Sequence, residues 1–175
     1  MSGRWVALLR GINVGRAKQV DMAVLRQVFA GLGCADVRTH LRSGNVVFTA
    51  DGPPAEDAVE AAVEAATGVS CRVLVRSADE LREVADANPY AAVADDPSRL
   101  LVAFQSAPMP DDEWAAFQAG VRAPAEAQRV GRAVYVWCPD GVQEATAGLQ
   151  RTSKGVISTA RNWRTVTKLL EIASG

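Results

Sequence analysis

Two continuous apolar runs constrain the fold of this chain more than any other feature of its sequence. They are residues 5–9 (WVALL) and residues 100–104 (LLVAF). A strand that is apolar at every position is typical of a sheet covered on both faces. Because a similar succession of predicted strands and helices follows each run, the sequence indicates two repeats of one α/β unit.

The first run opens the order β-α-β-β-α-β, which is that of a ferredoxin-like plait. Asp21 is the expected N-cap of the first helix, Gly33 is its expected C-cap, and Ser43-Gly44 is the expected hairpin turn. The predicted elements are strand 5–9, helix 22–32, strand 37–41, strand 45–49, helix 53–68 and strand 71–75.

The second run opens a less regular copy of the same order. Ser77 and Glu80 form a capping-box pattern that begins a short helix ending before Pro89. The elements expected next are strand 100–104, a helix from residue 110, a hairpin of 127–130 with 133–137, and a short helix over 141–149. No eighth strand is expected, because the polar residues 150–159 lead directly into a last helix.

The predicted fold class is therefore α/β (α+β), with two tandem degenerate ferredoxin-like (α/β-plait) repeats. The second repeat is expected to end in a C-terminal helix in place of its last strand. The predicted boundaries are 1–76 for the first plait-like repeat, 77–98 for a helical connector and 99–175 for the second repeat, all packed as one globular unit.

The last helix is expected to have an apolar face and a basic face. Trp163, Val166 and Leu169 recur at helical spacing, which predicts a buried stripe. The other face bears Arg161, Arg164, Thr165 and Lys168. Cations in the first turn of a helix are disfavoured by roughly 0.3–1 kcal/mol each, because the macrodipole is positive there. Either this small cost is tolerated, or the helix start holds an anion.

The net charge of −1 conceals an uneven distribution of charge. Residues 1–49 carry +5, residues 151–175 carry +4, and residues 50–150 carry −10. If the two ends meet in space, they form a positive patch that attracts anions. The alternative is that the basic and acidic segments neutralise one another.

Cysteine and histidine usage argues against a disulfide framework and a zinc site. Cys34, Cys71 and Cys138 are widely spaced and form no CxxC pair, and His40 is the only histidine. We expect the cysteines to be small core residues of a cytoplasmic protein. No signal peptide and no apolar run of about 20 residues is present, so no membrane association is expected. No cofactor is implied.

Three polar segments are the candidate site. The loop over residues 10–18 lies between a strand and a helix, where backbone amides can hold an anion, although its spacing matches neither a Walker nor a Rossmann loop. In the turn 43–45, Asn45 is the candidate ligand residue, but we expect this turn at the opposite edge of the sheet from the loop. The third segment is Thr152-Ser153-Lys154 with Ser158-Thr159 and the basic face of the last helix. Each segment also has a structural interpretation, as a loop pinned by Asn13, a hairpin turn and a helix N-cap.

Catalytic machinery is hard to identify. His40 has no evident acid or serine partner, and the acids from Glu56 to Glu64 are interpreted as a solvated helix face. An enzyme would therefore need a general base that the sequence does not reveal.

Three motifs together resemble a known family: residues 7–15 (ALLRGINVG), 42–48 (RSGNVVF) and 160–169 (ARNWRTVTKL). The chain is similar to the bacterial family of uncharacterised proteins called domain of unknown function 1697. The resemblance implies two tandem plait-like repeats and no established activity. Arg16 and Arg42 depart from the commoner family pattern, and both add positive charge beside the candidate site.

The leading hypothesis is a cytoplasmic protein that binds an anion through a basic site. The ligand would be a nucleotide, a phosphorylated metabolite or a nucleic-acid backbone. The candidate ligand-binding residues are Arg10, Asn13, Lys18, Asn45, Lys154, Arg161, Arg164 and Lys168. One alternative is an enzyme acting on a small phosphorylated or carboxylated substrate, with arginines as electrostatic stabilisers. The other is that the motifs only tie the two repeats together. Nothing in the sequence indicates an oligomeric state.

Overall fold

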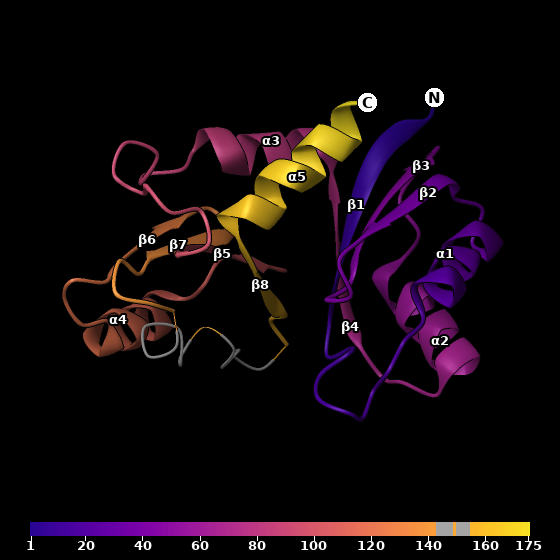
Figure 1. Cartoon of the computed structure of the whole chain (residues 1–175), viewed down its shortest axis with the longest axis horizontal. Helices are drawn as coiled ribbons and strands as arrows, with labels where there is room; N and C mark the ends of the chain where they lie inside the picture. Colours follow the sequence, from indigo (N-terminus) through magenta and orange to yellow (C-terminus); the bar gives the residue numbers. More distant parts are fainter. Residues whose placement is uncertain (143–148, 150–154) are drawn as a thin grey trace. The chain divides into compact units, whose positions relative to one another are not determined.

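Two four-stranded antiparallel sheets form the framework of the chain (Figure 1). The computed structural model describes residues 1–142, 149 and 155–175. The chain divides into two compact units, Met1–Arg82 with Leu169–Gly175, and Glu83–Lys168. One sheet belongs to each unit.

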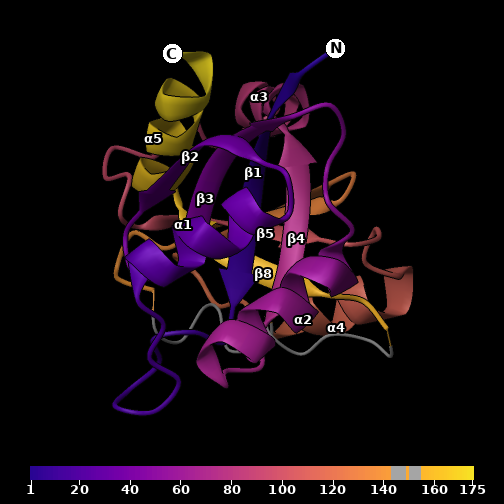
Figure 2. The same cartoon turned by 90° about the vertical axis from the view of Figure 1, so that its right-hand side faces the viewer.

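The first sheet has the strand order β2-β3-β1-β4, and two helices cover one of its faces (Figure 2). Its elements are β1 (Gly3–Arg10), α1 (Met22–Gly31), β2 (Ala35–His40), β3 (Asn45–Ala50), α2 (Glu56–Thr67) and β4 (Arg72–Ser77). Leu25 and Phe29 of α1 and Val63 of α2 pack with Leu9 and Phe48 of the sheet in one apolar core. This is the ferredoxin-like arrangement that the sequence predicts.

Local signals account for the ends of these helices. Asp21 caps α1 by accepting a hydrogen bond from the amide of Ala23 at 2.6 Å. Gly33 follows α1 with φ +85°, and its amide bonds to the carbonyl of Ala30, which is the glycine-terminated helix end expected there. The capping box is also confirmed. Ser77 Oγ accepts from the amide of Glu80, whose carboxylate accepts from the amide of Ser77, at the start of α3 (Ala78–Asp86).

The second sheet has the order β6-β7-β5-β8, which repeats the order of the first. Its unit contains β5 (Leu100–Gln105), α4 (Asp111–Gly120), β6 (Glu126–Val130), β7 (Ala133–Trp137) and β8 (Ser158–Asn162), and α5 (Trp163–Ser174) follows. Phe117 of α4 packs on Ala103, Val134 and Val136 of the sheet. Two ferredoxin-like repeats are therefore confirmed.

The expectation that the second repeat lacks its last strand is wrong. Residues Ser158–Asn162 form β8 and pair antiparallel with β5, from Gln105 opposite Ser158 to Leu101 opposite Asn162. The segment STARN has no strand-like apolar pattern, and its pairing with a central strand overrides its weak propensity. The other part of the expectation, a short helix over 141–149 and a polar run from 150, falls largely on residues 143–148 and 150–154, outside the described residues.

The last helix consequently begins at Trp163, later than predicted. Asn162 supplies the N-cap signal, since its Oδ1 accepts from the amide and the hydroxyl of Thr165 at 2.9 and 3.0 Å. Thr159, Ala160 and Arg161 belong to the strand, so the helix-dipole argument does not apply to Arg161.

Two buried tyrosines of the second unit differ in their hydrogen bonding. The hydroxyl of Tyr135 donates to the carbonyl of Val84 at 2.5 Å, whereas no described group reaches the Tyr90 hydroxyl in hydrogen-bonding geometry. Burial raises the pKa of both phenols to about 12, with Glu126 adding to the rise at Tyr90 and Gln128 opposing it.

This difference predicts opposite responses to the same substitution. Tyr135→Phe should lower the free energy of unfolding by about 1–2 kcal/mol, because it leaves the Val84 carbonyl unsatisfied. Tyr90→Phe removes a hydroxyl that makes no hydrogen bond of good geometry with the described residues and feels Gln128 only weakly, so it should be neutral or slightly stabilising. Urea denaturation of the two variants checks the prediction, and a larger loss for Tyr90→Phe than for Tyr135→Phe would contradict it.

Candidate functional site

The loop after β1 and the turn between β2 and β3 lie at the same end of the first sheet. β1 and β3 are antiparallel neighbours with Leu8 opposite Asn45, so the end of β1 meets the start of β3. The amide of Leu9 donates to the carbonyl of Gly44 at 2.8 Å, directly in the turn. The expectation that turn and loop lie at opposite edges is therefore wrong, because it overlooked this antiparallel pairing.

Asn13 ties the loop to itself and to the turn. Its Nδ2 donates to the carbonyls of Arg42 at 2.6 Å and Val20 at 3.2 Å, and its Oδ1 accepts from the amide of Val20 at 2.8 Å. Its own amide donates to the carbonyl of Lys18 at 2.7 Å. Asn13 has φ +52°, a left-handed conformation that asparagine tolerates better than most residues. Asn13 therefore has the structural role that the sequence suggested, and its side-chain amide is engaged in hydrogen bonds within the protein.

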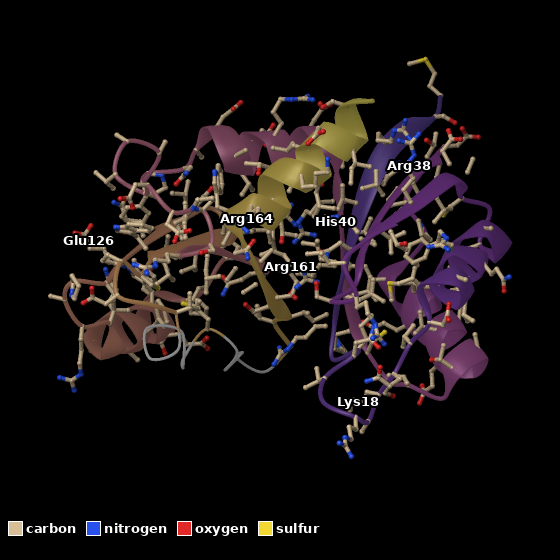
Figure 3. The ribbon with its side chains drawn as sticks, viewed as in Figure 1. Lys18, Arg38, His40, Glu126, Arg161 and Arg164 are labelled. Carbon is tan, nitrogen blue, oxygen red and sulfur yellow. The ribbon has the colours of Figure 1, made fainter. Side chains whose placement is uncertain are left out.

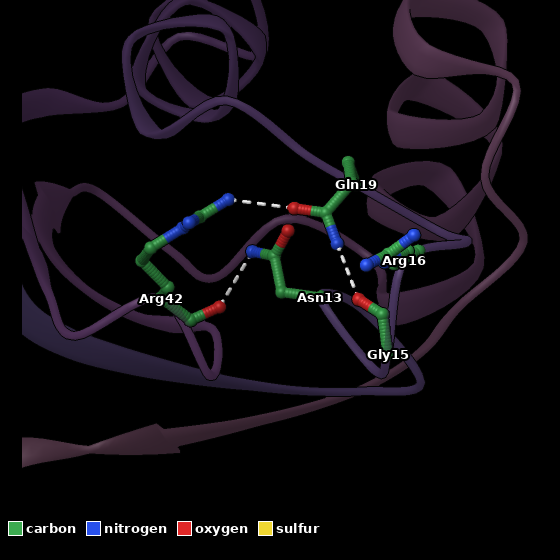
Figure 4. Close-up of a pocket in the computed structure, with 5 residues that line it drawn as sticks. All are labelled: Asn13, Gly15, Arg16, Gln19 and Arg42. Carbon is green, nitrogen blue, oxygen red and sulfur yellow. Dashed lines mark hydrogen bonds between the residues drawn. The ribbon is translucent and has the colours of Figure 1, made fainter.

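A pocket of about 420 Å³ lies at this junction (Figure 4). Its lining consists of Asn13, Gly15, Arg16, Gln19 and Arg42. Gln19 holds both sides together, since its Nε2 donates to the carbonyl of Gly15 and its Oε1 accepts from Arg42 Nη2, each at 2.7 Å. Arg16 is exposed and makes no hydrogen bond or ion pair with the described part of the chain. We call this site the loop–turn pocket.

The loop–turn pocket has two guanidinium groups and no carboxylate in its lining. Guanidinium groups present forked N–H donors that match phosphate and carboxylate oxygens. Chemically, the pocket is therefore suited to an anion. Its residues Arg16, Gln19 and Arg42 are not among those predicted to contact a ligand. The motif comparison identified the two arginines only as added charge, and no sequence pattern singles out Gln19.

Arg10 and Lys18 line a second pocket, of about 630 Å³, together with residues of α2 and the start of β4. The lining is Arg10, Gly11, Lys18, Asp57, Glu60, Ala61, Glu64, Ser70, Cys71 and Arg72. Glu60 Oε1 lies 3.5 Å from Arg72 Nε, and Glu64 accepts a hydrogen bond from Ser70 Oγ at 2.9 Å. The lining contains three basic and three acidic side chains. This pocket therefore lacks the excess of positive charge that the loop–turn pocket has.

The sequence suggested that the acids of α2 form a solvated face, but two of them also accept hydrogen bonds from the backbone of β4. Glu56 Oε1 accepts from the amide of Val75 at 2.8 Å, and Glu60 Oε1 accepts from the amide of Val73 at 2.9 Å. β4 is an edge strand, and these two carboxylates satisfy amides on its free side. This corrects the interpretation of Glu56 and Glu60.

Asn45 is completely buried and closes the hairpin. Its Nδ2 donates to the carbonyl of His40 at 2.8 Å and to Ser43 Oγ at 3.1 Å. The side chain is thus part of the turn rather than of the pocket lining.

The remaining predicted site residues belong to the second unit. Figure 3 shows Arg161 on β8 and Arg164 at the start of α5. Arg161 is buried, donates to Thr159 Oγ1 at 2.9 Å and to the carbonyl of Ala160 at 2.8 Å, and burial lowers its pKa to about 10. Arg164 and Lys168 are exposed. Lys154 lies outside the described residues.

Asp96 lies close enough to Arg164 to respond to its charge. Hydrogen bonds from Ser98 lower the pKa of Asp96, with smaller contributions from Arg99 and Arg164. The amide of Arg164 also donates to the carbonyl of Pro97 at 3.3 Å. Arg164 therefore lies near an acidic residue of its own unit.

The three cysteines are free and buried, which confirms their prediction as core residues. Burial raises the pKa of each thiol, to about 11 for Cys71, so none is activated as a nucleophile. Within residues 1–142, 149 and 155–175, no group of three or more His, Cys, Asp or Glu side chains is placed to hold a metal ion. The same part of the chain contains no helix that is long and apolar enough to cross a membrane.

The fold and the loop–turn pocket define an α+β protein of two ferredoxin-like repeats with a polar pocket on the first repeat. Residues 2–135 match the model of the family described as "Protein of unknown function (DUF1697)", so the chain belongs to that family and the resemblance noted from its motifs is confirmed. A search of curated proteins gives no match.

Matches among solved structures include the following two proteins. The conserved bacterial protein SP0830 from Streptococcus pneumoniae is 22% identical, with a TM-score of 0.73 and 99% of each chain covered. At this identity the likeness shows the fold alone. An unknown protein from Galdieria sulphuraria is 10% identical with a TM-score of 0.29, over 99% of this chain and 91% of its own, and this likeness supports no conclusion.

Proposed function

We propose that the chain binds a phosphate-bearing small molecule in the loop–turn pocket, with Arg16 and Arg42 as the groups that hold the anion. The observation that carries the proposal is the pairing of two arginines with a pocket lining that contains no carboxylate. Arg10 and Lys18 line the mixed-charge pocket instead, so the anion is assigned to Arg16 and Arg42.

The hydrogen bonds around the pocket support this role. Asn13 and Gln19 hold the loop and the turn together, so the two arginines are brought to one place before a ligand arrives. Preorganisation of this kind reduces the entropy lost on binding. The Arg42–Gln19 contact still leaves other N–H groups of Arg42 for a ligand, because a guanidinium has five donors.

An enzyme is the second candidate, because the pocket around Arg10 contains carboxylates. Glu60 accepts a strand amide and lies near Arg72, Glu64 accepts a serine hydroxyl, and Asp57 accepts the amide of Ala58 at 2.9 Å. Since each acid is engaged in a structural contact, none stands out as a general base. Binding is therefore the better supported proposal. Free cysteines also favour the cytoplasm as the proposed location.

Isothermal titration with ribose 5-phosphate tests the proposal. Arg16→Ala and Arg42→Ala should each weaken binding by roughly tenfold or more, because a hydrogen bond to a charged group contributes about 1.5–3 kcal/mol. Arg26→Ala is the matched control. It removes the same charge from the same unit, but Arg26 lies on α1 and bonds to Thr39 at 2.8 Å, outside the pocket lining. Equal losses in all three variants would reduce the effect to net charge and refute the assigned site.

A further inference from the structure

Leu41 has a backbone conformation that is unusual for its residue type. It has φ +59°, a left-handed conformation that is unfavourable for residues with a Cβ and that favours glycine or asparagine. Its side chain is also 56% exposed, so packing does not compensate for the strain. Residues held in sparsely populated backbone conformations cluster at active sites and ligand-binding sites.

A second exposed aliphatic residue belongs to the loop, the other segment of the same junction. Val14 is 65% exposed and stands between Asn13 and Gly15, two residues of the pocket lining. Leu41 directly precedes Arg42, and the hydrogen bond from the Asn13 side chain to the Arg42 carbonyl joins the loop to the turn beside both residues. Exposed aliphatic residues therefore adjoin the loop–turn pocket through both segments that form it.

We infer that the loop–turn pocket takes a nucleoside monophosphate, with its phosphate at Arg16 and Arg42 and its base against Leu41 and Val14. The inference rests on the proposed function and adds the class of ligand. A nucleotide combines an anionic end, hydroxyl groups that an amide such as Gln19 can bind, and a compact apolar face.

The pocket chemistry favours a base over a long apolar tail. An acyl chain would need a continuous apolar channel, but none of the five lining residues is aliphatic. Two aliphatic side chains beside the pocket match the small face of one base. The volume of about 420 Å³ also suits one nucleotide rather than a longer strand.

Titration of the full chain with AMP, ribose 5-phosphate and adenosine tests the inference, with Leu41→Asn as the key variant. Wild type should bind AMP at least fivefold more tightly than ribose 5-phosphate, and adenosine more weakly than AMP. Leu41→Asn should weaken AMP binding roughly fivefold, leave ribose 5-phosphate binding unchanged, and raise the melting temperature by about 2–4 °C, because asparagine tolerates the left-handed backbone. Val93→Asn, at an aliphatic residue of the other unit that is 59% exposed, should change neither affinity.

The outcomes separate this inference from the proposed function. If AMP and ribose 5-phosphate bind equally well, or if Leu41→Asn leaves AMP binding intact, the nucleotide inference is wrong while phosphate binding stands. If neither ligand binds, or if binding is insensitive to Arg16→Ala and Arg42→Ala, the proposed function itself fails. Loss of both affinities in Leu41→Asn with an unchanged melting temperature would also overturn the assignment of Leu41 to the base.

Discussion

Replacement of Gly44 by alanine should destabilise the protein by about 2–4 kcal/mol, among the largest effects expected of any single substitution in the first repeat. Gly44 has φ +95°, and a Cβ built on it would lie 2.8 Å from Leu9 Cβ and 2.9 Å from Ile12 Cδ1. Leu9 of β1 and Ile12, in the loop after the strand, are both buried, so neither can move away freely. Backbone strain and overpacking therefore act together.

Gly15→Ala is the matched control for backbone strain alone. Gly15 has φ +64°, but no atom lies within 4 Å of its added Cβ, so the variant should lose only about 1 kcal/mol. Urea denaturation of both variants measures the difference. If the two lose equal stability, the close approach of the turn to β1 is not the cause.

Most of the fold could be predicted because its signals are local. The cap at Asp21, the capping box of Ser77 and Glu80 and the glycine after α1 each act within a few residues, and all are present. β8 could not be predicted from its composition, because its strand character comes from pairing with β5. The N-cap at Asn162 was the local signal that could have placed the helix start correctly.

The candidate site was predictable in part, and the error lay in where its segments were placed in the sheet. The loop, the turn and the added arginines were all recognised as polar segments, but the loop and the turn were assigned to opposite edges. In a plait the first and third strands are antiparallel neighbours, so the contact of Leu9 with Gly44 follows from the strand order itself. The expected placement of Arg161 on the last helix was wrong for a different reason, because the residue belongs to β8 and is buried there, which a helical wheel cannot show.

The directions of its hydrogen bonds explain why residue 13 is an asparagine and not an aspartate. Its amide nitrogen faces two carbonyl oxygens, of Val20 and Arg42, while its amide oxygen faces one N–H. An aspartate of the same shape can accept but cannot donate when ionised. Only an asparagine satisfies all three groups in this left-handed position.

Asn13→Asp should therefore lower the free energy of unfolding at pH 7 by about 2–3 kcal/mol, because two carbonyl oxygens lose their donor and face a carboxylate. Those oxygens disfavour ionisation, so the pKa of the new carboxyl should be raised above its unfolded value of about 3.9. A carboxyl whose pKa is higher in the folded than in the unfolded state destabilises the fold least when the pH is below its unfolded pKa. The loss in free energy of unfolding then grows as the pH rises through the folded pKa. Urea denaturation should accordingly show a smaller deficit, relative to wild type, at pH 4 than at pH 7.

The same substitution at Asn162 should have the opposite sign. There the side-chain oxygen accepts from the amide and hydroxyl of Thr165 at the start of α5, and no described group takes a hydrogen bond from its nitrogen. A carboxylate accepts at least as well and is favoured by the helix dipole, so Asn162→Asp should be neutral or stabilise by up to about 1 kcal/mol. If both substitutions proved equally harmful, a general effect of added negative charge would explain them. In that case the donor role of Asn13 would not be what joins the loop to the turn.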